Sequence, residues 1–340
     1  MSRSISCAWK SKSSPGPRTL TSACGVSVSG DMDWLLYWLG RGLIAGLQAL
    51  PLRVAAIAGR TLGGLAYWLD ARHRRMAAHN LAASFPEKAP AEIRALAREN
   101  FRRIGENFAC AAKTAALSAA ELAPHLEFSG VEALKSPPAE GRRANRVFAI
   151  GHFGNFEIYA RAASHLPGYQ VATTYRALRQ PRLNRLLQSL REKSGCLYFE
   201  RRLEGGKLRE AMRQKNLFLG LLADQHGGRR GLRLPFFGRD CSTNPAPAIF
   251  ALRYRLPLHT AFCFRLGPAR WRLELGAEIP TRENGRARSP AAIMLDVNRA
   301  FEEAIRRDPA NWFWVHNRWK SPGRSATHGT AGAPPSPSAR

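Results

Sequence analysis

After residue 146 the sequence alternates between short apolar runs and helical stretches, and this alternation limits the folds open to the chain. Six apolar runs are each long enough for one buried strand: 147–150, 169–174, 196–199, 217–222, 258–264 and 271–277. A helical stretch at 183–193 separates the second run from the third. Strands that alternate with helices favour a parallel sheet with right-handed crossovers. We therefore predict an α/β fold with a mixed, mostly parallel sheet flanked by helices.

The segment 34–69 is almost entirely apolar. A helix that spans a membrane needs about 20 apolar residues. In each half of this segment, however, polar residues recur seven apart and so lie on one helical face: Arg41 with Gln48, and Arg53 with Arg60. Such stripes favour an N-terminal membrane-associated helical segment, as two interfacial helices or one tilted span. The alternative is a pair of helices buried in a soluble bundle. A basic cluster at 72–75 favours anionic lipid on the cytoplasmic side.

These features divide the chain into four segments. Residues 1–31 are Ser-rich and lack the apolar core of a signal peptide, so we expect them to be disordered or to precede the true start at Met32. Residues 32–75 are the expected membrane-anchoring or interfacial helices, and 76–322 the α/β domain. Residues 323–340 are rich in Ser, Pro, Gly and Ala and are expected to be a disordered tail. An amphipathic helix is predicted at about 91–117.

The charge balance is strongly basic, with 52 Lys and Arg against 25 Asp and Glu and a formal net charge of +27. Such a field attracts nucleic acid, anionic lipid or an acidic carrier protein. The basic residues are spread over the whole chain and form no recognisable nucleic-acid-binding module, so we predict no nucleic-acid partner. The six cysteines have no zinc-ligand spacing, and Asp224-Gln-His226 has no third ligand nearby in sequence. No metal and no cofactor are predicted.

The stretch 151–157 carries the residues best suited to catalysis. His152 follows the predicted strand 147–150 and so lies at a carboxyl end, where ligands of α/β sheets gather. Gly154 permits a tight turn, Asn155 is a candidate helix N-cap, and Glu157 falls in the first turn of the helix. We expect Glu157 to fold back beside the imidazole, because a carboxylate makes histidine a better base. The alternative is a core histidine paired with a helix-capping carboxylate.

Other polar side chains also follow predicted strands. Arg176 comes after the strand 169–174, and its sequence position alone does not distinguish a site residue from a surface residue. Asp224 and Gln225 follow the strand 217–222, where Asp224 is expected either to orient Arg176 or bind substrate, or to cap a turn. Phe236-Phe237 are expected to line an apolar channel or to pack in the core rather than to stack on nucleic-acid bases. The aromatic segment 312–319 suits an interfacial belt, a core edge or a docking site.

Five sequence blocks occur in an order typical of one enzyme family. They are Asn80–Glu87; Gly151–Glu157; Thr174–Arg176 with Pro181 and Asn184; Ala223–Gln225 with Pro235–Gly238 and Thr243; and Trp314–Lys320. On these blocks the chain resembles, from about Met32 to Lys320, the bacterial lipid A biosynthesis (late) acyltransferases, within the wider His-x4-Asp/Glu glycerolipid acyltransferase superfamily. The fourth of these blocks departs from the family pattern in its prolines at 244–247 and in the basic run 226–230.

The resemblance implies that an acyl carrier protein supplies the acyl group. It also implies that a membrane lipid hydroxyl receives this group at the cytoplasmic face of the cell inner membrane. The family's histidine and acid map onto His152 and Glu157, and its arginine maps onto Arg176, which would hold an acceptor phosphate or assist the thioester oxyanion. Asn155, Asp224 and Gln225 are the further candidate substrate-binding residues. The expected acceptor is a lipid A precursor or similar glycolipid; the alternatives are a lysophospholipid or other membrane lipid, or a non-catalytic membrane-surface scaffold.

Overall fold

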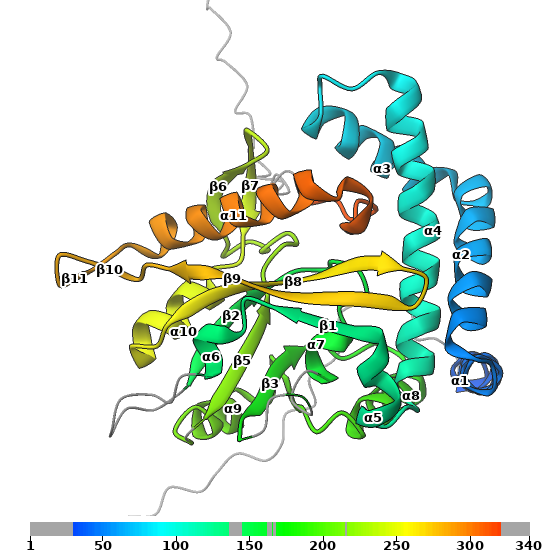
Figure 1. Cartoon of the computed structure of the whole chain (residues 1–340), viewed down its shortest axis with the longest axis horizontal. Helices are drawn as coiled ribbons and strands as arrows, with labels where there is room; N and C mark the ends of the chain where they lie inside the picture. The colour runs from blue at the N-terminus through cyan, green and yellow to red at the C-terminus, as the bar shows by residue number, and fades with distance from the viewer. Residues whose placement is uncertain (1–29, 136–144, 162–164, 166–167, 215, 321–340) are drawn as a thin grey trace, which may run out of the picture.

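A seven-stranded sheet forms the centre of the protein, as the computed structural model shows (Figure 1). The structure describes residues 30–135, 145–161, 165, 168–214 and 216–320. Residues 1–29 of the segment expected to be disordered or to precede the true start, and the predicted tail 323–340, lie outside the described residues. The strand order is β1-β9-β8-β2-β5-β3-β4. The strands are β1 (Leu126–Ser129), β2 (Arg146–Ile150), β3 (Gln170–Tyr175), β4 (Leu197–Glu200), β5 (Leu217–Leu222), β8 (Leu258–Gly267) and β9 (Arg270–Ile279).

Neighbouring strands in this sheet run parallel except for the antiparallel pair β8 and β9. The prediction of a mixed, mostly parallel sheet is therefore confirmed. β2 lies between β8 and β5, and successive side chains of a strand point to opposite faces of a sheet. Val147 and Ala149 accordingly join the main core, whereas Phe148 and Ile150 join a separate apolar cluster on the other face.

Helices cover both faces of the sheet, as predicted. The main core packs against α9 (Gly205–Ala211), α10 (Ala246–Tyr254) and α11 (Pro290–Arg307), and α11 crosses one face of the sheet in Figure 1. The other face is covered by the short helices α6 (Glu132–Lys135) and α7 (Ile158–Arg161).

Two hairpins were not predicted from the sequence. β6 (Leu232–Phe236) pairs with β7 (Arg239–Thr243), and β10 (Arg282–Glu283) pairs with β11 (Arg286–Ala287). The first turns at Phe237 and Gly238, both at positive φ. Glycine adopts that region without steric cost, which suits it to a tight turn.

Among the described residues, four long helices come before the sheet: α1 (Gly30–Ala49), α2 (Leu52–Leu69), α3 (Ala71–Ser84) and α4 (Pro90–Thr114). They are followed by α5 (Ala119–Leu122) and the 3-10 helix η1 (Ala123–His125). Two members of the predicted polar stripes face α4: the Gln48 side chain donates to the Ala112 carbonyl at 3.0 Å, and Arg60 pairs with Glu99 at 2.7 Å. The stripes therefore serve partly in helix packing, while Arg41 and Arg53 are exposed.

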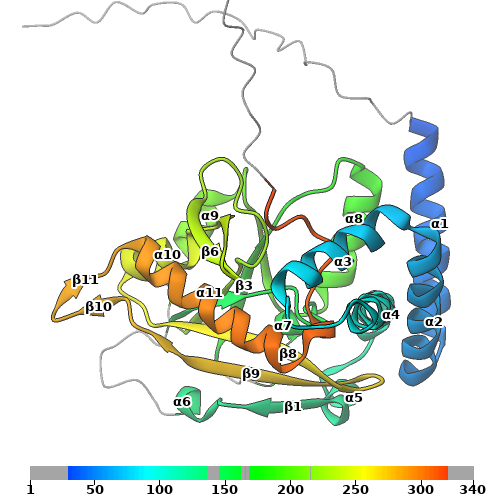
Figure 2. The same ribbon diagram turned by 90° about the horizontal axis from the view of Figure 1, so that it is seen from above.

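The outward faces of α1 and α2 carry exposed large apolar side chains. They are Met32, Trp34, Leu35, Trp38, Leu39 and Leu43 on α1, and Val54, Ile57, Leu62, Leu65, Trp68 and Leu69 on α2. The two helices lie together at one edge of the molecule (Figure 2). Among the described helices, none combines the length and the apolar character needed to cross a bilayer.

A buried ion-pair network joins the helical layer to the sheet. Glu106 of α4 is fully buried and accepts from Arg265 of β8 at 2.9 Å, and Arg60 of α2 lies 3.5 Å from the same carboxylate. Arg103, one turn earlier on α4, pairs with Asp308 at 2.6 Å, just after α11. Removing one partner of a buried pair leaves an uncompensated charge, which is strongly destabilising. The network therefore fixes α4 against the sheet and against the segment that follows α11.

Candidate active site

Three of the predicted site residues lie at the carboxyl ends of three adjacent strands. The strands β2, β5 and β3 are neighbours and run parallel. His152 follows the end of β2, Asp224 the end of β5, and Arg176 the end of β3. Parallel pairing brings these ends to one edge of the sheet, where ligands of open α/β sheets bind. Arg176 is exposed at this edge.

The carboxylate that contacts the imidazole is that of Asp224. His152 Nδ1 lies 2.9 Å from Asp224 Oδ1, and the His152 backbone N–H donates to Oδ2 at 2.8 Å. The Trp312 indole N–H donates to the same Oδ2, also at 2.8 Å. Asp224 is fully buried and the His152 side chain is 15% exposed. One buried carboxylate thus fixes both the backbone and the ring of His152.

The surroundings of Asp224 keep its carboxyl ionised. Burial alone opposes ionisation, but the attraction of His152 and the hydrogen bonds from His152 and Trp312 outweigh it, so the pKa of Asp224 lies below its ordinary value. Hydrogen bonds to the charged form and a nearby positive charge both favour a carboxylate over the acid. Asp224 is therefore an anion at neutral pH and can stabilise a protonated imidazole.

Glu157 takes a different partner from the one expected. Its carboxylate accepts two hydrogen bonds from the Arg191 guanidinium, at 2.5 and 3.2 Å, instead of lying on the imidazole of His152. Arg191 lies in the last turn of α8 (Pro181–Glu192), and its guanidinium stands over the ring of Tyr198 at 5.2 Å. The expectation that Glu157 folds back to the imidazole is corrected here, because α8 offers it a bidentate cationic partner.

The turn between β2 and α7 also differs in detail from the prediction. The helix starts at Ile158, so Glu157 lies in the preceding turn, not in the first helical turn. Asn155 is buried, its backbone carbonyl accepts from the Ile158 N–H, and its side chain has no hydrogen-bond partner among the described residues. It is therefore not a side-chain N-cap. Gly154 has a φ of +50°, and a Cβ there would lie 2.5 Å from the Cys263 carbonyl, so this turn requires glycine.

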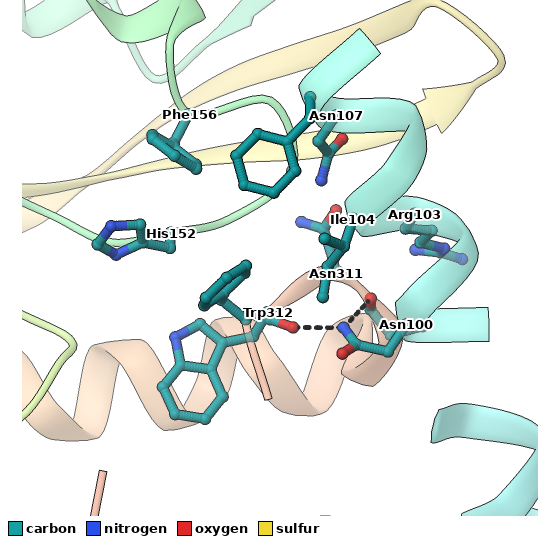
Figure 3. A pocket seen from close by; sticks show the side chains of 12 residues that line it. Asn100, Arg103, Ile104, Asn107, His152, Phe156, Asn311 and Trp312 are labelled. Atoms are coloured by element: carbon teal, nitrogen blue, oxygen red, sulfur yellow. Dashed lines mark hydrogen bonds between the residues drawn. The ribbon is translucent and has the colours of Figure 1, made fainter. Parts of the chain in front are cut away.

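A shallow crevice opens beside His152, with an empty volume of about 270 Å³ that includes space open to solvent. It lies between α4 and the segment around the 3-10 helix η3 (Pro309–Asn311), and Figure 3 shows Ile104 and Asn107 of α4 facing the turn that carries His152 and Phe156. Asn100 also lines it, and its side-chain amide donates to the carbonyls of Ala310 and Trp312 at 3.0 and 2.5 Å. One wall of this crevice is therefore held by hydrogen bonds, and His152 forms part of its lining.

The chain was compared with known proteins. The model of the bacterial lipid A biosynthesis acyltransferase family matches residues 28–321. The chain belongs to this family. A lipid A biosynthesis palmitoleoyltransferase of Escherichia coli (strain K12) is 25% identical over 297 residues, which cover 85% of this chain and 92% of the relative. A lipid A biosynthesis acyltransferase of Shigella flexneri matches to the same extent. A lipid A biosynthesis myristoyltransferase of E. coli is 25% identical over 211 residues, 62% of this chain and 64% of the relative.

The protein is accordingly an acyltransferase. Two of its sequence blocks meet at Arg318, which belongs to the C-terminal block. This guanidinium is fully buried and donates to the carbonyls of Gln225 and Ser242 at 2.8 and 2.5 Å and to the Thr243 hydroxyl at 2.9 Å. The backbone of Gln225, a predicted substrate-binding residue, is thus tied to the C-terminal block. Asn80 of the first block donates to the carbonyls of Trp314 and His316.

Two residues of this acyltransferase site were not singled out individually from the sequence. Trp312 contacts Asp224 directly, and Arg318 holds the residues beside it. The sequence of the aromatic segment 312–319 suits a core edge, an interfacial belt or a docking site. The burial of Trp312, Trp314 and Arg318 supports the core edge. Within the described residues, no group of three His, Cys, Asp or Glu side chains is placed to hold a metal ion.

The cysteines of the described part of the acyltransferase are poor nucleophiles. Cys110, Cys196, Cys241 and Cys263 are buried, and burial raises the pKa of each thiol, that of Cys196 to about 12. The nucleophile in thiol chemistry is the thiolate. An acyl-enzyme formed on one of these side chains is therefore disfavoured at neutral pH.

His316 adds a pH-dependent contribution to the stability of this site. Its Nε2 accepts from the His226 backbone N–H at 3.1 Å, and burial, the largest cause, lowers its pKa to about 4. The unfolded chain therefore binds a proton at this residue between about pH 6.5 and pH 4 while the folded protein does not. The contribution of neutral His316 to the free energy of unfolding is therefore fully present above about pH 6.5 and is lost as the pH falls towards 4.

We predict that wild type loses about 1–2 kcal/mol more free energy of unfolding than His316→Gln between about pH 7.5 and pH 5, after allowance for the partial exposure of the ring. The glutamine amide oxygen can still accept the His226 N–H but does not titrate in this range. Urea denaturation at the two pH values measures the difference. His79→Gln, at an exposed position of α3, is the matched control and should behave as wild type. Equal pH dependence in wild type and His316→Gln would contradict the assignment.

Proposed function

We propose that this acyltransferase moves a fatty acyl chain from the thioester of an acyl carrier protein to a hydroxyl of a lipid A precursor or similar glycolipid. His152 is the general base in this proposal, and Asp224 orients it. The observation that carries the proposal is the contact of the His152 ring and backbone with one buried carboxylate. The names of the relatives, a palmitoleoyltransferase and a myristoyltransferase of lipid A biosynthesis, support the acceptor. A lysophospholipid or other membrane lipid is the alternative acceptor.

The geometry supports direct transfer. Since Asp224 accepts the Nδ1 proton, Nε2 carries the lone pair that takes the proton from the attacking hydroxyl. The hydroxyl oxygen adds to the thioester carbonyl, and the negative charge moves to the carbonyl oxygen. When the C–S bond breaks, the leaving sulfur receives the proton from the imidazolium. The carboxylate of Asp224 stabilises the imidazolium between these two steps, so no covalent enzyme intermediate is required.

Further side chains at the site receive proposed roles in binding. Arg176 stands exposed at the end of β3, beside the strand that carries Asp224, and is suited to hold an acceptor phosphate or to stabilise the oxyanion. Glu157 and Arg191 together attach the catalytic turn to α8. We propose that Glu157 acts on His152 through the position of this turn. Asn155 and Gln225 remain proposed substrate-binding residues.

The apolar faces of α1 and α2 are proposed to lie on the cytoplasmic face of the inner membrane. Their exposed leucine and tryptophan side chains form an apolar surface that can be buried among lipid acyl chains, as in helices that lie in a membrane interface. The formal charge of +27 favours binding to anionic headgroups. This placement brings α8 close to the membrane, because α1 packs on it, and Arg191 of α8 pairs with Glu157 of the turn that carries His152.

The transfer reaction is tested with purified protein, acyl carrier protein thioester and membrane lipid. Wild type should release free carrier thiol and form an acylated lipid, and His152→Ala should lower the rate by about 10²–10⁴-fold, the usual contribution of a general base. Thiol titration and mass spectrometry of the lipid measure the two products. A melting temperature like that of wild type shows that the variant is folded. Release that is absent in wild type, or undiminished in His152→Ala, would refute the proposed function.

Membrane binding is tested by flotation with vesicles that contain anionic lipid. Leu39 and Leu62 are 62% and 57% exposed on α1 and α2. The double change Leu39→Ser and Leu62→Ser should weaken vesicle binding about tenfold, because the apolar area transferred from water is lost. Ile249→Ser changes a side chain of α10 that is 45% exposed and is the matched control. Equal binding by the double variant and wild type would exclude this face as the contact.

A further inference from the structure

Asn107 of α4 lines the crevice beside His152 (Figure 3) and makes no side-chain hydrogen bond to any of the described residues. It shares one face of α4 with Asn100 and Arg103, because residues three, four or seven apart lie on the same side of a helix. Those two side chains are held by the segment 308–312, through the carbonyls that Asn100 binds and the ion pair of Arg103. The carboxamide of Asn107 has no such partner.

On grounds of stability alone, asparagine is unfavourable at position 107. The residue lies inside α4, which continues to Thr114, so its side chain caps neither end of the helix. Asparagine has a lower helix propensity than alanine. Its Oδ1 is shielded from solvent and has no donor among the described residues, and an unpaired atom of this kind destabilises a protein. Proteins carry local costs like these at functional sites, so the carboxamide is better explained by a ligand.

The carboxamide oxygens around the crevice need hydrogen-bond donors. The Oδ1 atoms of Asn100, Asn107 and Asn311 are all shielded from solvent, and none has a donor within the described part of the chain. The amide N–H groups of Asn100 and Asn311 donate to backbone carbonyls, which fixes the orientation of these two side chains. A thioester has only acceptor atoms, whereas a hydroxyl both donates and accepts. The crevice therefore suits a ligand with hydroxyl groups better than the thioester of the donor.

Aromatic rings give the crevice an apolar side as well. Phe108, which follows Asn107, is 55% exposed, and its ring meets that of Phe313 edge to face at 6.5 Å between centroids. The ring centroid of His152 lies 5.9 Å from that of Phe313 and 4.7 Å from that of Phe156. All of these rings line the crevice. Apolar surface thus leads from the exposed side of α4 to the imidazole, and a lipid presents hydrocarbon beside its hydroxyl groups.

The position of α4 favours a ligand that comes from the membrane. Helix α4 stands between α2 and the sheet, and α2 packs along it (Figure 1). The outward side of α2 carries apolar side chains that are proposed to contact lipid. Arg176, by contrast, follows β3, and β2 lies between β3 and β8, the strand that α4 contacts through Glu106 and Arg265. The crevice thus opens beside His152 on the side of the proposed membrane-facing helices.

We propose that this crevice is the subsite for the hydroxyl-bearing part of the lipid acceptor, and that Asn107 positions the reacting hydroxyl at His152. This inference rests on the proposed function, since it assumes a hydroxyl acceptor and His152 as the general base. The Asn107 amide N–H donates to a lone pair of the hydroxyl oxygen, whose own proton points to Nε2 of the imidazole. The carboxamide oxygens accept from neighbouring hydroxyls. Asn107 thereby touches and orients the substrate but takes no part in the proton transfer.

The test compares two fates of the acyl carrier protein thioester: transfer to a lipid A precursor, and hydrolysis by water when no lipid is present. Asn107→Ala should lower kcat/KM for the acceptor by about tenfold, the effect of one lost hydrogen bond. Its rate of hydrolysis should equal that of wild type, because neither the thioester nor His152 loses a contact. Thiol titration with and without the lipid measures both rates.

Gln214→Ala is the matched control, because this carboxamide is exposed after α9 and does not line the crevice. It should transfer and hydrolyse as wild type does. Equal losses of transfer and hydrolysis in Asn107→Ala would assign Asn107 to the thioester and overturn the inference. An unchanged rate of transfer would also overturn it, since the carboxamide would then hold no more than a water molecule.

Thermal unfolding separates a positioning role from a structural one. Asn107→Ala should melt about 1–3 °C above wild type, because alanine is the better helix former and no shielded oxygen is left unpaired. A lower melting temperature together with the loss of both rates would show that Asn107 supports the fold, and would overturn the inference.

A binding measurement distinguishes the failure of this inference from the failure of the proposed function. The lipid A precursor in detergent micelles is titrated into each protein without the carrier, by isothermal titration calorimetry. About tenfold weaker binding to Asn107→Ala than to wild type and Gln214→Ala supports the acceptor subsite even if no transfer occurs. Equal affinities overturn it even if wild type transfers the acyl chain.

Discussion

The arrangement of the site depends on the buried carboxylate of Asp224. Burial of a carboxylate away from water is unfavourable unless hydrogen bonds replace its hydration. Three groups donate to Asp224: the His152 backbone N–H, the His152 ring N–H and the Trp312 indole N–H. These donors come from the end of β2 and from the segment after α11. Removal of one donor would leave the buried carboxylate with too few hydrogen bonds. The position of His152 therefore depends on how the end of β2 packs against the segment after α11.

The surrounding structure holds this arrangement rigid from several sides. Asn100 of α4 binds the carbonyls of Ala310 and Trp312, and the buried Glu106 fixes α4 against β8. Arg318 fixes the backbone next to Asp224 through the Gln225 carbonyl. In the proposed mechanism His152 is therefore oriented before the substrate arrives and needs no reorganisation during the reaction. Helix α2 packs on α4 and joins this framework through Arg60, whereas the apolar side chains on the outward faces of α1 and α2 are exposed and available for the proposed membrane contact.

The sequence predicted the parts of the structure that are encoded locally. Apolar runs located six of the seven strands of the sheet but not β1, and parallel pairing then brought His152, Asp224 and Arg176 to one edge of the sheet. The partner of His152 could not be read in this way, because Asp224 is 72 residues away and Trp312 lies a further 88 residues from Asp224. The local spacing of Glu157 suggested the wrong contact, since nothing in the sequence shows that Arg191 reaches it. The β6–β7 hairpin was missed because Pro235 interrupts its strand pattern.

The most direct test of the account is a double-mutant cycle on His152 and Asp224, measured as the rate of carrier-thiol release at saturating substrates. Asp224→Asn keeps the shape of the side chain but removes the charge that stabilises the imidazolium. If Asp224 acts through His152, the variant with both Asp224→Asn and His152→Ala is as slow as His152→Ala alone, because residues that work as a unit have non-additive effects. Losses that multiply in the double variant, or an Asp224→Asn variant as fast as wild type, would contradict the assignment of Asp224 as the residue that orients the base.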